Sequence, residues 1–512
     1  MKDQKQFFGL SSVPLVIILG ALVKFALHLY YASGYGYFLD ELYTIALSRH
    51  LAWGYVDLPP LVPALVALSR LLLGKSFFAF HIVPALAGAL TLVFVCLITR
   101  EFGGKWFAIA LAALGFIIVP IWLAIDSIFC YDSIDQLILA GFLYTLVRFL
   151  RSGNRKLWLL LGLIAGIACL TKMTILFLGP GFLLALLVSK YRKDLITPWP
   201  WLGAALCLAV ITPYMLWQHA NHWPTLEYWT RYDTVRMYHA SIRQYLTNIL
   251  IYMNPFVMPF YVAGLYRLFR PLKGVNYAFL GILFLFTLGM MYALRMPARL
   301  LAELFIPLLA GGALFAEELL AGLRWEKAGQ AVATTYLLVI GIFAMPLNLP
   351  ILPVDQMEAY ADHFKMFYQP LREFNFTSFY PLLLTGRLGW DTLPRDVAGV
   401  YDGLPPEYRK IAGIYTDSYA TAAAIDVLGP PYGLPHAVSG SLTYYLWGPG
   451  YSWDVIVLVT DRTNNMSVFF DECKLKAVSQ YDFDPFGHAY IYVCRKPKVP
   501  ANVIWSSVKT YR

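Results

Sequence analysis

The sequence predicts a polytopic α-helical membrane protein with a C-terminal extracytoplasmic α/β domain. Of its 512 residues, 59% are hydrophobic and only 14% are charged, whereas a soluble chain has about 45–50% and about 25%. The mean hydropathy is +0.58. Disorder, collagen, coiled coils and disulfide scaffolds each need a composition that this chain lacks. The six cysteines form no CxxC pair or Cys/His cluster, which argues against a zinc or iron–sulfur site.

Apolar runs of about 20 residues, the length that crosses the hydrocarbon core, recur as far as residue 346. They predict about eleven spans and a membrane domain over 1–346. The runs lie at 12–32, 79–99, 106–124, 134–150, 156–171, 173–189, 199–217, 246–266, 276–294, 300–320 and 329–346. The first run is too long for a signal peptide and lacks its cleavage pattern, so we expect it to be retained.

Basic residues predict the orientation. Lysine and arginine are more numerous in the loops on the side of the N-terminus than in the opposite loops, although the opposite loops are longer in total. The positive-inside rule therefore places the N-terminus in the cytoplasm. An odd number of spans then places the C-terminal domain outside. The net charge of +9 follows from these loops, and we expect no nucleic-acid partner.

The chain changes character after about residue 350. Residues 347–393 form an aromatic-rich connector without clear periodicity, and residues 394–512 alternate short apolar runs with polar and helical stretches. The apolar runs at 411–416, 455–460 and 489–494 indicate strands, and an alanine-rich segment around 418–428 indicates a helix. Strands alternating with helices predict a small α/β domain with a mostly parallel sheet.

Carboxylates gather on the predicted outer face. Asp40 and Glu41 follow the first span. Adjacent acids there could supply a general base or bind a divalent cation, or they could cap a short helix beginning near Glu41. Asp57 precedes Pro59 and Pro60, which fix the backbone and present Asp57 from a stiff turn, either for chemistry or as an ordinary cap.

A second acidic group lies in DSIFCYDSIDQL, residues 126–137. Asp132 and Asp135 are three residues apart, so on a helix they share one face. Like charges so close are unfavourable unless a cation or donor lies between them, which favours a binding site. The alternative is a helix N-terminus, where the helix dipole also favours carboxylates.

Basic side chains at outer helix ends complete the candidate set. Lys172, Arg295 and Arg299 suit an anionic ligand such as a phosphate. They could equally anchor helices at the membrane interface. Lys24 lies inside the first span, where we expect it to point into the helix bundle or to reach the interface.

Together these features resemble the integral-membrane glycosyltransferases of the C superfamily (GT-C). They are similar in particular to the bacterial branch related to protein O-mannosyltransferases and to the transferase that adds aminoarabinose to lipid A. The resemblance covers most of the chain and rests on Asp40-Glu41, the Asp57-x-Pro59-Pro60-Leu61 segment, FCYDSIDQL, the segment ending in Lys172, and tail segments 416–429 and 432–450. The chain departs from the family at Leu58, where a basic residue or His is commoner, and at Asp132, where relatives often carry Asn.

The resemblance implies a multi-pass protein of the bacterial cytoplasmic membrane and a sugar donor carried on a polyprenyl phosphate. Asp40 would be the general base, and Asp135, together with Glu41, would order the site. Asp40 and Asp135 are also the tentative ligands of a divalent metal ion. Lys172 and an arginine would stabilise the phosphate, with Asp57 and Asp132 beside the substrate. The acceptor is a hydroxyl of a glycan, lipid or protein. No nucleotide cofactor is expected, since no GxGxxG or Walker pattern occurs.

The tail offers aromatic side chains and two cysteines. Tyr444, Tyr445 and Trp447 could stack on a sugar, or they could only pack the domain. Cys473 and Cys494 could form a disulfide in an oxidising compartment or remain two buried thiols.

Two rival functions stay open. A transporter or flippase for a lipid-linked substrate predicts polar residues at mid-span and an internal pseudo-repeat, and charges at mid-span are nearly absent here. A non-catalytic scaffold with a binding tail leaves the clustered carboxylates without a role.

Overall fold

The computed structural model describes residues 2–31, 34–235, 239–372, 380–461, 468–480 and 488–511. The chain forms two compact units, each assembled from separate stretches of sequence. The first unit comprises Met1–Gly34, Leu73–Met215 and His239–Glu373, and the second comprises Tyr35–Leu72, Leu216–Tyr238 and Phe374–Arg512. The segment that carries Asp40 and Asp57 therefore belongs to the same compact unit as the C-terminal sheet.

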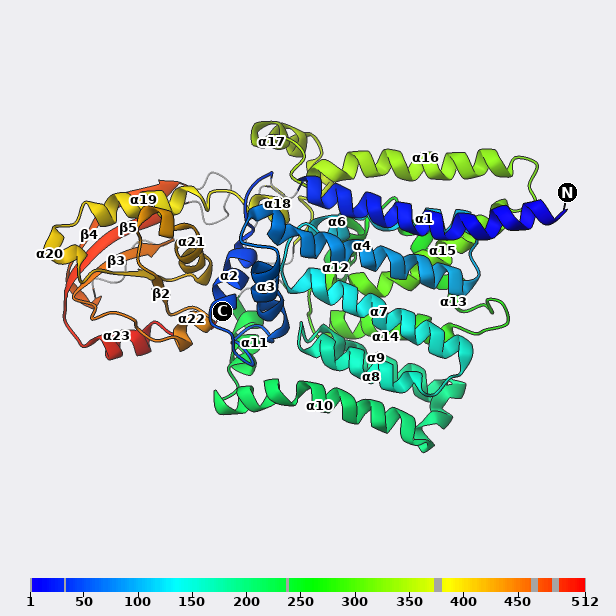
Figure 1. Ribbon diagram of the computed structural model, residues 1–512, viewed down its shortest axis with the longest axis horizontal. Helices are drawn as coiled ribbons and strands as arrows, with labels where there is room; N and C mark the ends of the chain where they lie inside the picture. The colour runs from blue at the N-terminus through cyan, green and yellow to red at the C-terminus, as the bar shows by residue number, and fades with distance from the viewer. Residues whose placement is uncertain are drawn as a thin grey trace. The chain divides into compact units, whose positions relative to one another are not determined.

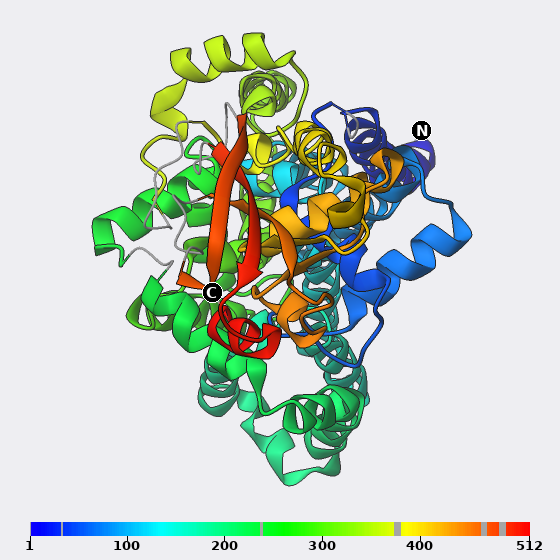
Figure 2. The same ribbon diagram turned by 90° about the vertical axis from the view of Figure 1, so that its left-hand side faces the viewer.

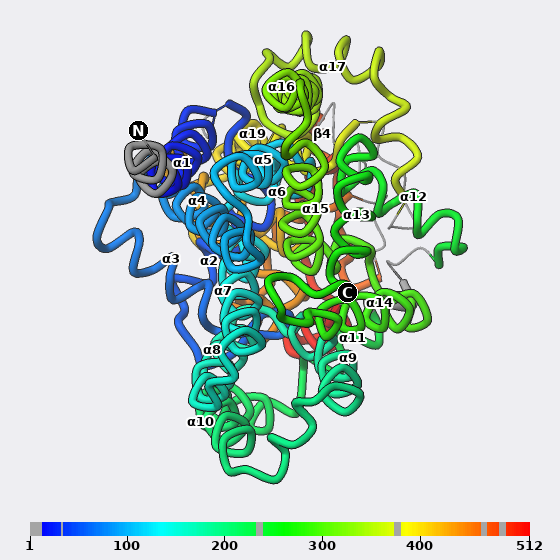
Figure 3. The backbone as a smooth tube through the Cα atoms, turned by 90° about the vertical axis from the view of Figure 1, so that its right-hand side faces the viewer, coloured from blue at the N-terminus to red at the C-terminus, as the bar shows by residue number. Residues whose placement is uncertain are grey.

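The first unit is helical. Its elements are α1 (Lys2–Tyr31), α4 (Phe77–Phe102), α5 (Trp106–Ile117), α6 (Pro120–Ile125), α7 (Tyr131–Ser152), α8 (Leu157–Cys169), α9 (Thr174–Val188), η1 (Lys190–Ile196), α10 (Pro198–Ala220), which runs on into the second unit, α12 (Ile242–Met253), α13 (Met258–Leu268), α14 (Ala278–Ala293), η2 (Ala298–Leu304), α15 (Phe305–Leu320), α16 (Glu326–Ala344), η3 (Met345–Leu347), α17 (Val354–His363) and η4 (Lys365–Phe367). The helices α1, α4, α5, α7 and α15 pack side by side (Figure 1) and are seen almost end-on in Figure 3.

Each predicted apolar run is largely helical, but several of the helices are short or broken. Among the described residues, six helices are long and apolar enough to cross a membrane, or up to eight if each of two bent pairs forms one span. The run at 106–124 is divided between α5 and α6, where Pro120 begins α6. The run at 246–266 bends by 102° between α12 and α13. The structure thus has fewer long apolar helices than the number of spans predicted, because hydropathy does not show where a run is interrupted.

Glycine permits the close crossing of α13 and α15. A Cβ atom built at Gly264 of α13 lies 1.7 Å from the carbonyl oxygen of Leu308, and one built at Gly312 of α15 lies 1.9 Å from that of Phe260. Both distances are far below van der Waals contact, and the atoms that they meet belong to the backbone. In membranes, where helix association lacks the usual hydrophobic drive, such small residues let helices approach closely.

We expect Gly312→Ala to destabilise the protein by at least about 1–3 kcal/mol, because the added methyl group forces two backbones apart. Gly289→Ala is the matched control, since a Cβ atom at Gly289 of α14 meets nothing within 4 Å and alanine favours helix. Thermal unfolding of the purified protein in detergent measures both. An equal Tm for Gly312→Ala and the wild type would contradict the close crossing.

The second unit joins helices to a five-stranded sheet (Figure 2). Its helices are α2 (Leu39–Ser48), α3 (Leu61–Leu72), α11 (Pro224–Val235), α18 (Leu382–Thr385), α19 (Thr392–Asp402), α20 (Pro406–Arg409), α21 (Tyr419–Leu428), η5 (Pro430–Tyr432), α22 (Thr443–Leu446) and α23 (Ala501–Ser507). Its strands are β1 (Gly413–Thr416), β2 (Ala437–Ser439), β3 (Val455–Thr460), β4 (Phe470–Gln480) and β5 (His488–Pro497).

The sheet is mixed, which corrects the expectation of a mostly parallel one. The strand order is β2-β1-β3-β5-β4. Strand β1 pairs in parallel with β2 and β3, whereas β5 runs antiparallel to both β3 and β4. The sequence predicted β1, α21, β3 and β5. It missed β2, which has only three residues, and β4. The edge strand β4 is largely exposed and reads FDECKLKAVSQ, without the apolar run of a buried strand; lysines are typical of such an edge.

Cys473 and Cys494 form a disulfide. The two residues lie directly opposite each other on β4 and β5, so the antiparallel pairing brings their side chains together. Of the two alternatives left by the sequence, the structure contains the bridge. Disulfides are typical of oxidising compartments and rare in the cytosol.

The segments Tyr35–Leu72 and Leu216–Tyr238 each contact the C-terminal part of the second unit. The backbone N–H of Val56 donates to the hydroxyl of Thr443 at 3.0 Å. Further along the chain, Glu227 of α11 forms an ion pair with Lys509, with 2.7 Å between Oε2 and Nζ. Residues close to the apolar spans are therefore fixed to the C-terminal sheet domain.

Candidate active site

Asp40 and Glu41 lie in the first turn of α2, but only Asp40 is partly exposed. The helix begins at Leu39, and Phe38 precedes it with extended backbone. The carboxylate of Glu41 accepts a hydrogen bond from the backbone N–H of Phe38 at 2.8 Å, and its side chain is buried. Glu41 thus takes the capping role that the sequence left open. Asp40, in the same turn, stays partly exposed.

Two tyrosine hydroxyls contact the carboxylates of this segment. Tyr419, the first residue of α21, donates from Oη to Asp40 Oδ1 at 3.2 Å. Tyr43 of α2 donates to Asp57 Oδ1 at 2.8 Å, and its ring centroid lies 4.7 Å from that of Tyr419. Burial and the neighbouring Asp57 raise the pKa of Tyr43 well above its usual value, so Tyr43 remains a protonated donor.

Asp57 lies in the turn that the prolines predicted. The backbone N–H of Tyr55 donates to the carbonyl oxygen of Leu58 at 3.0 Å, and α3 begins at Leu61 directly after the two prolines. Leu58, the residue before the two prolines, is buried. Asp57 is partly exposed, and its contact with Tyr43 gives it a positioning role within the second unit.

The first unit holds a separate cluster of charges. Lys172, between α8 and α9, forms an ion pair with Asp132 of α7. Asp135, one turn further on, is buried, and its Oδ1 has no hydrogen-bond partner among the described residues. Asp135 interacts electrostatically with Lys172 and with Glu303 of η2. Lys172 thus supplies a cation beside the two aspartates, and Asp132 also lies in the first turn of α7, so both alternatives left by the sequence are present.

The candidate arginines differ in their surroundings. Arg299 of η2 is partly buried and acts electrostatically on Lys172, so it joins the charged cluster. Arg295 is exposed, and its Nη1 lies 2.7 Å from Nδ1 of His239. Glu303 stands out in the sequence as a carboxylate within an apolar run. Its interaction with Asp135 could not be predicted, because the two residues are far apart in the chain.

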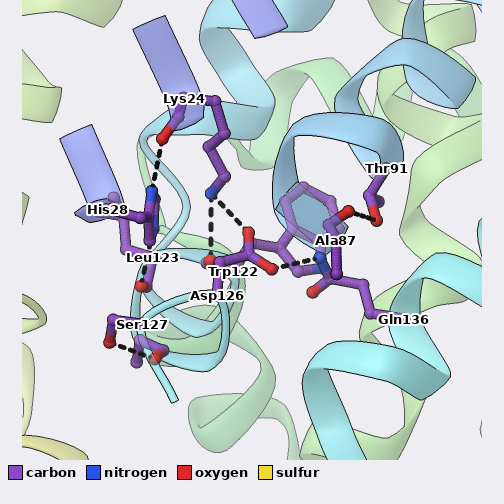
Figure 4. Close-up of polar contacts among 10 residues, drawn as sticks. Lys24, His28, Ala87, Thr91, Trp122, Leu123, Asp126, Ser127 and Gln136 are labelled. Carbon is purple, nitrogen blue, oxygen red and sulfur yellow. Dashed lines mark hydrogen bonds and ion pairs between the residues drawn. The ribbon is translucent and has the colours of Figure 1, made fainter. Parts of the chain in front are cut away.

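A buried ion pair lies close to the start of α7 (Figure 4). Lys24 Nζ lies 2.7 Å from Asp126 Oδ2, and both side chains are fully buried. Lys24 also donates to the carbonyl oxygen of Trp122 at 3.1 Å, and Gln136 donates to Asp126 Oδ1 at 2.9 Å. Lys24 therefore points into the bundle, one of the two placements expected. The network ties α1 to the turn from which α7 and its two aspartates begin.

Of the three aromatic residues that could stack on a sugar, Tyr444 instead packs the domain. It is buried, and its hydroxyl donates to Asp426 Oδ2 at 2.8 Å, so its ring offers no face to a sugar. Tyr445 stacks on Trp505 with an interplanar angle of 6°. The ring of Trp447 lies against His50, with 4.3 Å between centroids. Both keep partial exposure.

The described carboxylates do not form a metal centre as they stand. Within the part of the chain that the structure describes, no group of three or more His, Cys, Asp or Glu side chains could hold a metal ion. Asp40, one of the two tentative ligands, accepts a hydrogen bond from the hydroxyl of Tyr419. The described donor groups therefore do not fit a bound metal ion.

Comparison with known proteins gives the following matches. Residues 57–217 match the family described as dolichyl-phosphate-mannose-protein mannosyltransferase. The crystal structure of ArnT from Cupriavidus metallidurans bound to undecaprenyl phosphate is similar with a TM-score of 0.56 and 15% identity, over 93% of this chain and 97% of that one. Its apo state gives 0.58 and 14%, with the same coverage. No curated protein matches the sequence significantly.

Proposed function

We propose that this chain, which has the fold of the C-superfamily of integral-membrane glycosyltransferases, transfers a sugar from a polyprenyl phosphate to an acceptor hydroxyl. The proposal rests on the position and contacts of Asp40. Asp40 is a partly exposed carboxylate in the first turn of α2, its neighbour Glu41 is committed to the cap, and a tyrosine hydroxyl contacts one of its two oxygens. This arrangement suits a general base.

The proposed reaction is a single displacement. Asp40 accepts the proton of the acceptor hydroxyl as the hydroxyl oxygen attacks the anomeric carbon. The bond between the anomeric carbon and the phosphate oxygen breaks, and its electron pair leaves with the polyprenyl phosphate. Attack opposite the leaving group inverts the anomeric configuration.

Lys172 is the proposed phosphate-binding residue. Negative charge grows on the phosphate oxygen as the glycosidic bond breaks, and fixed cations stabilise that charge. Asp132 pairs with the Lys172 ammonium, and Asp135 adds a second negative field beside it, so both aspartates position the cation. Arg299 supplies further positive charge. The ArnT structure contains undecaprenyl phosphate, which supports a polyprenyl phosphate as the lipid carrier.

The proposed setting is the outer face of the bacterial cytoplasmic membrane. The positive-inside rule supports a cytoplasmic N-terminus, and the Cys473–Cys494 bridge supports an oxidising compartment for the sheet domain. The acceptor is a glycan, a lipid or a protein hydroxyl. Mass spectrometry of glycolipids and glycoproteins from cells with and without the chain tests the proposal; identical glycan profiles in cells that express the protein would argue against transfer.

We expect Lys172→Met to weaken binding of undecaprenyl phosphate about tenfold or more, because a charge-assisted contact to the phosphate is lost. Binding to the purified protein in nanodiscs, followed by native mass spectrometry, measures the change. Arg295→Met is the control, since Arg295 is exposed and contacts His239; its affinity should stay close to wild type. Unchanged affinity in Lys172→Met would remove Lys172 from the phosphate site.

A further inference from the structure

We propose that Tyr419 of the C-terminal domain is a positioning residue for Asp40, orienting its carboxylate through a hydrogen bond to Oδ1. The inference rests on the proposed function, in which Asp40 is the base. It assigns to the sheet domain a direct part in the chemistry, whereas the sequence suggested only aromatic contacts with a sugar. The two residues are 379 positions apart in the chain.

The contact is supported by the parallel packing of α2 and α21. At their N-terminal ends, Tyr419 Oη donates to Asp40 Oδ1 at 3.2 Å. Toward their C-terminal ends, Arg49, which follows α2, donates from Nη1 to the carbonyl oxygen of Asp426 at 2.8 Å. These contacts at both ends fix the two helices in register. The start of α21 is also held by Ser418, whose hydroxyl accepts a hydrogen bond from the backbone N–H of Ala420 at 3.3 Å.

The ring of Tyr419 packs against the buried ring of Tyr43. The two ring centroids are 4.7 Å apart, with an interplanar angle of 57°. Tyr43 is almost completely buried; it donates to Asp57 and accepts a hydrogen bond from the backbone N–H of Thr443 at 3.4 Å. Because hydrogen bonds to Asp57 and Thr443 hold Tyr43 in place, Tyr43 restricts the position of the Tyr419 ring and therefore of the Tyr419 hydroxyl.

The hydrogen bond from Tyr419 affects the ionisation of Asp40 and so its use as a base. A hydroxyl that donates to a carboxylate stabilises the ionised form of the acid and orients the acceptor oxygen. An ionised Asp40 is the form that can accept the proton of an acceptor hydroxyl. If Tyr419 served only to pack α21 on α2, its ring would suffice and its hydroxyl would have no effect on the acid limb of the pH profile.

Tyr419→Phe separates these two roles, since it keeps the ring and removes the hydroxyl. We expect kcat to fall about tenfold, the effect of one hydrogen bond to a charged group, with little change in KM. We also expect the acid limb of the pH profile to move up by about one unit. Tyr451→Phe is the matched control: Tyr451 is partly exposed and stacks on His436, but its hydroxyl donates to a backbone carbonyl. Its pH profile should match wild type.

A second measurement does not depend on activity. Carbodiimides modify protonated carboxyl groups, so modification of Asp40, followed by peptide mass spectrometry across pH, reports its protonation directly. In Tyr419→Phe the midpoint should move to higher pH, whereas in Tyr451→Phe it should stay at the wild-type value. A wild-type midpoint and pH profile in Tyr419→Phe would overturn the inference. Normal transfer by Asp40→Asn would instead refute Asp40 as the base, whatever Tyr419 does to its protonation.

Discussion

Asp40→Asn is expected to abolish transfer, lowering kcat/KM by about 10²–10⁴-fold, the contribution typical of a general base. Asparagine keeps the size of the side chain and retains an oxygen that can accept the hydrogen bond of Tyr419, so the fold should be preserved. What it loses is the ability to take a proton from the acceptor. Transfer by the purified variant, compared with wild type at equal amounts of folded protein, measures the effect.

Glu41→Gln is the control for Asp40→Asn. The amide oxygen can still accept from the N–H of Phe38, the bond that Glu41 makes in the structure, so we expect a stability loss of no more than about 1 kcal/mol. Activity per folded molecule should remain close to wild type. Near-normal transfer by Asp40→Asn would remove Asp40 from the catalytic role, and a complete loss in Glu41→Gln with a wild-type Tm would return Glu41 to it.

Lys24→Met is expected to give the largest loss of stability. It leaves Asp126 without its cation in a fully buried position, and breaking a buried pair in this way costs about 3–5 kcal/mol. A typical protein has about 5–15 kcal/mol in total, so we expect a low yield of folded protein and a much lower Tm in detergent. The double variant Lys24→Met/Asp126→Leu should recover much of the loss, because no unpaired charge remains.

Arg151→Met provides the comparison with an exposed ion pair. Arg151 pairs with Glu101, and its side chain is half exposed; such pairs contribute about 0–1 kcal/mol. Its Tm should therefore stay close to wild type. If Lys24→Met were as stable as Arg151→Met, the buried pair would not hold α1 to the start of α7.

The sequence predicted the features that depend on local pattern. Long apolar runs located the helices, the fold expected from the resemblance was confirmed by the similarity to ArnT, and VIVLVT matched β3 at 455–460. The spacing of Asp132 and Asp135 favoured a nearby cation or donor, with a helix N-terminus as the alternative, and the structure has both: Lys172 pairs with Asp132, which lies in the first turn of α7. These inferences succeeded because helical period and hydropathy act over a few residues.

Features that depend on distant parts of the chain could not be predicted. Nothing in the spacing of the sequence indicates that Tyr419 contacts Asp40, since the pairing of α2 with α21 brings them together. Tyr444 lay in an aromatic loop typical of sugar binding, yet its ring is buried, and one sequence does not show which aromatic side chains a sheet domain uses for its own packing. The edge strand β4 was missed for a related reason, because exposure removes the apolar signal.

The interleaving of the two units sets an order of events during synthesis. The second unit is built from residues 35–72, 216–238 and 374–512, so its first segment leaves the ribosome long before its last. At about 5–20 residues per second, the 379 residues between Asp40 and Tyr419 correspond to about 20–75 seconds. During that interval Asp40 exists without the hydroxyl that contacts it. A ribosome-bound or prematurely terminated chain that ends before Tyr419 therefore lacks this contact to Asp40.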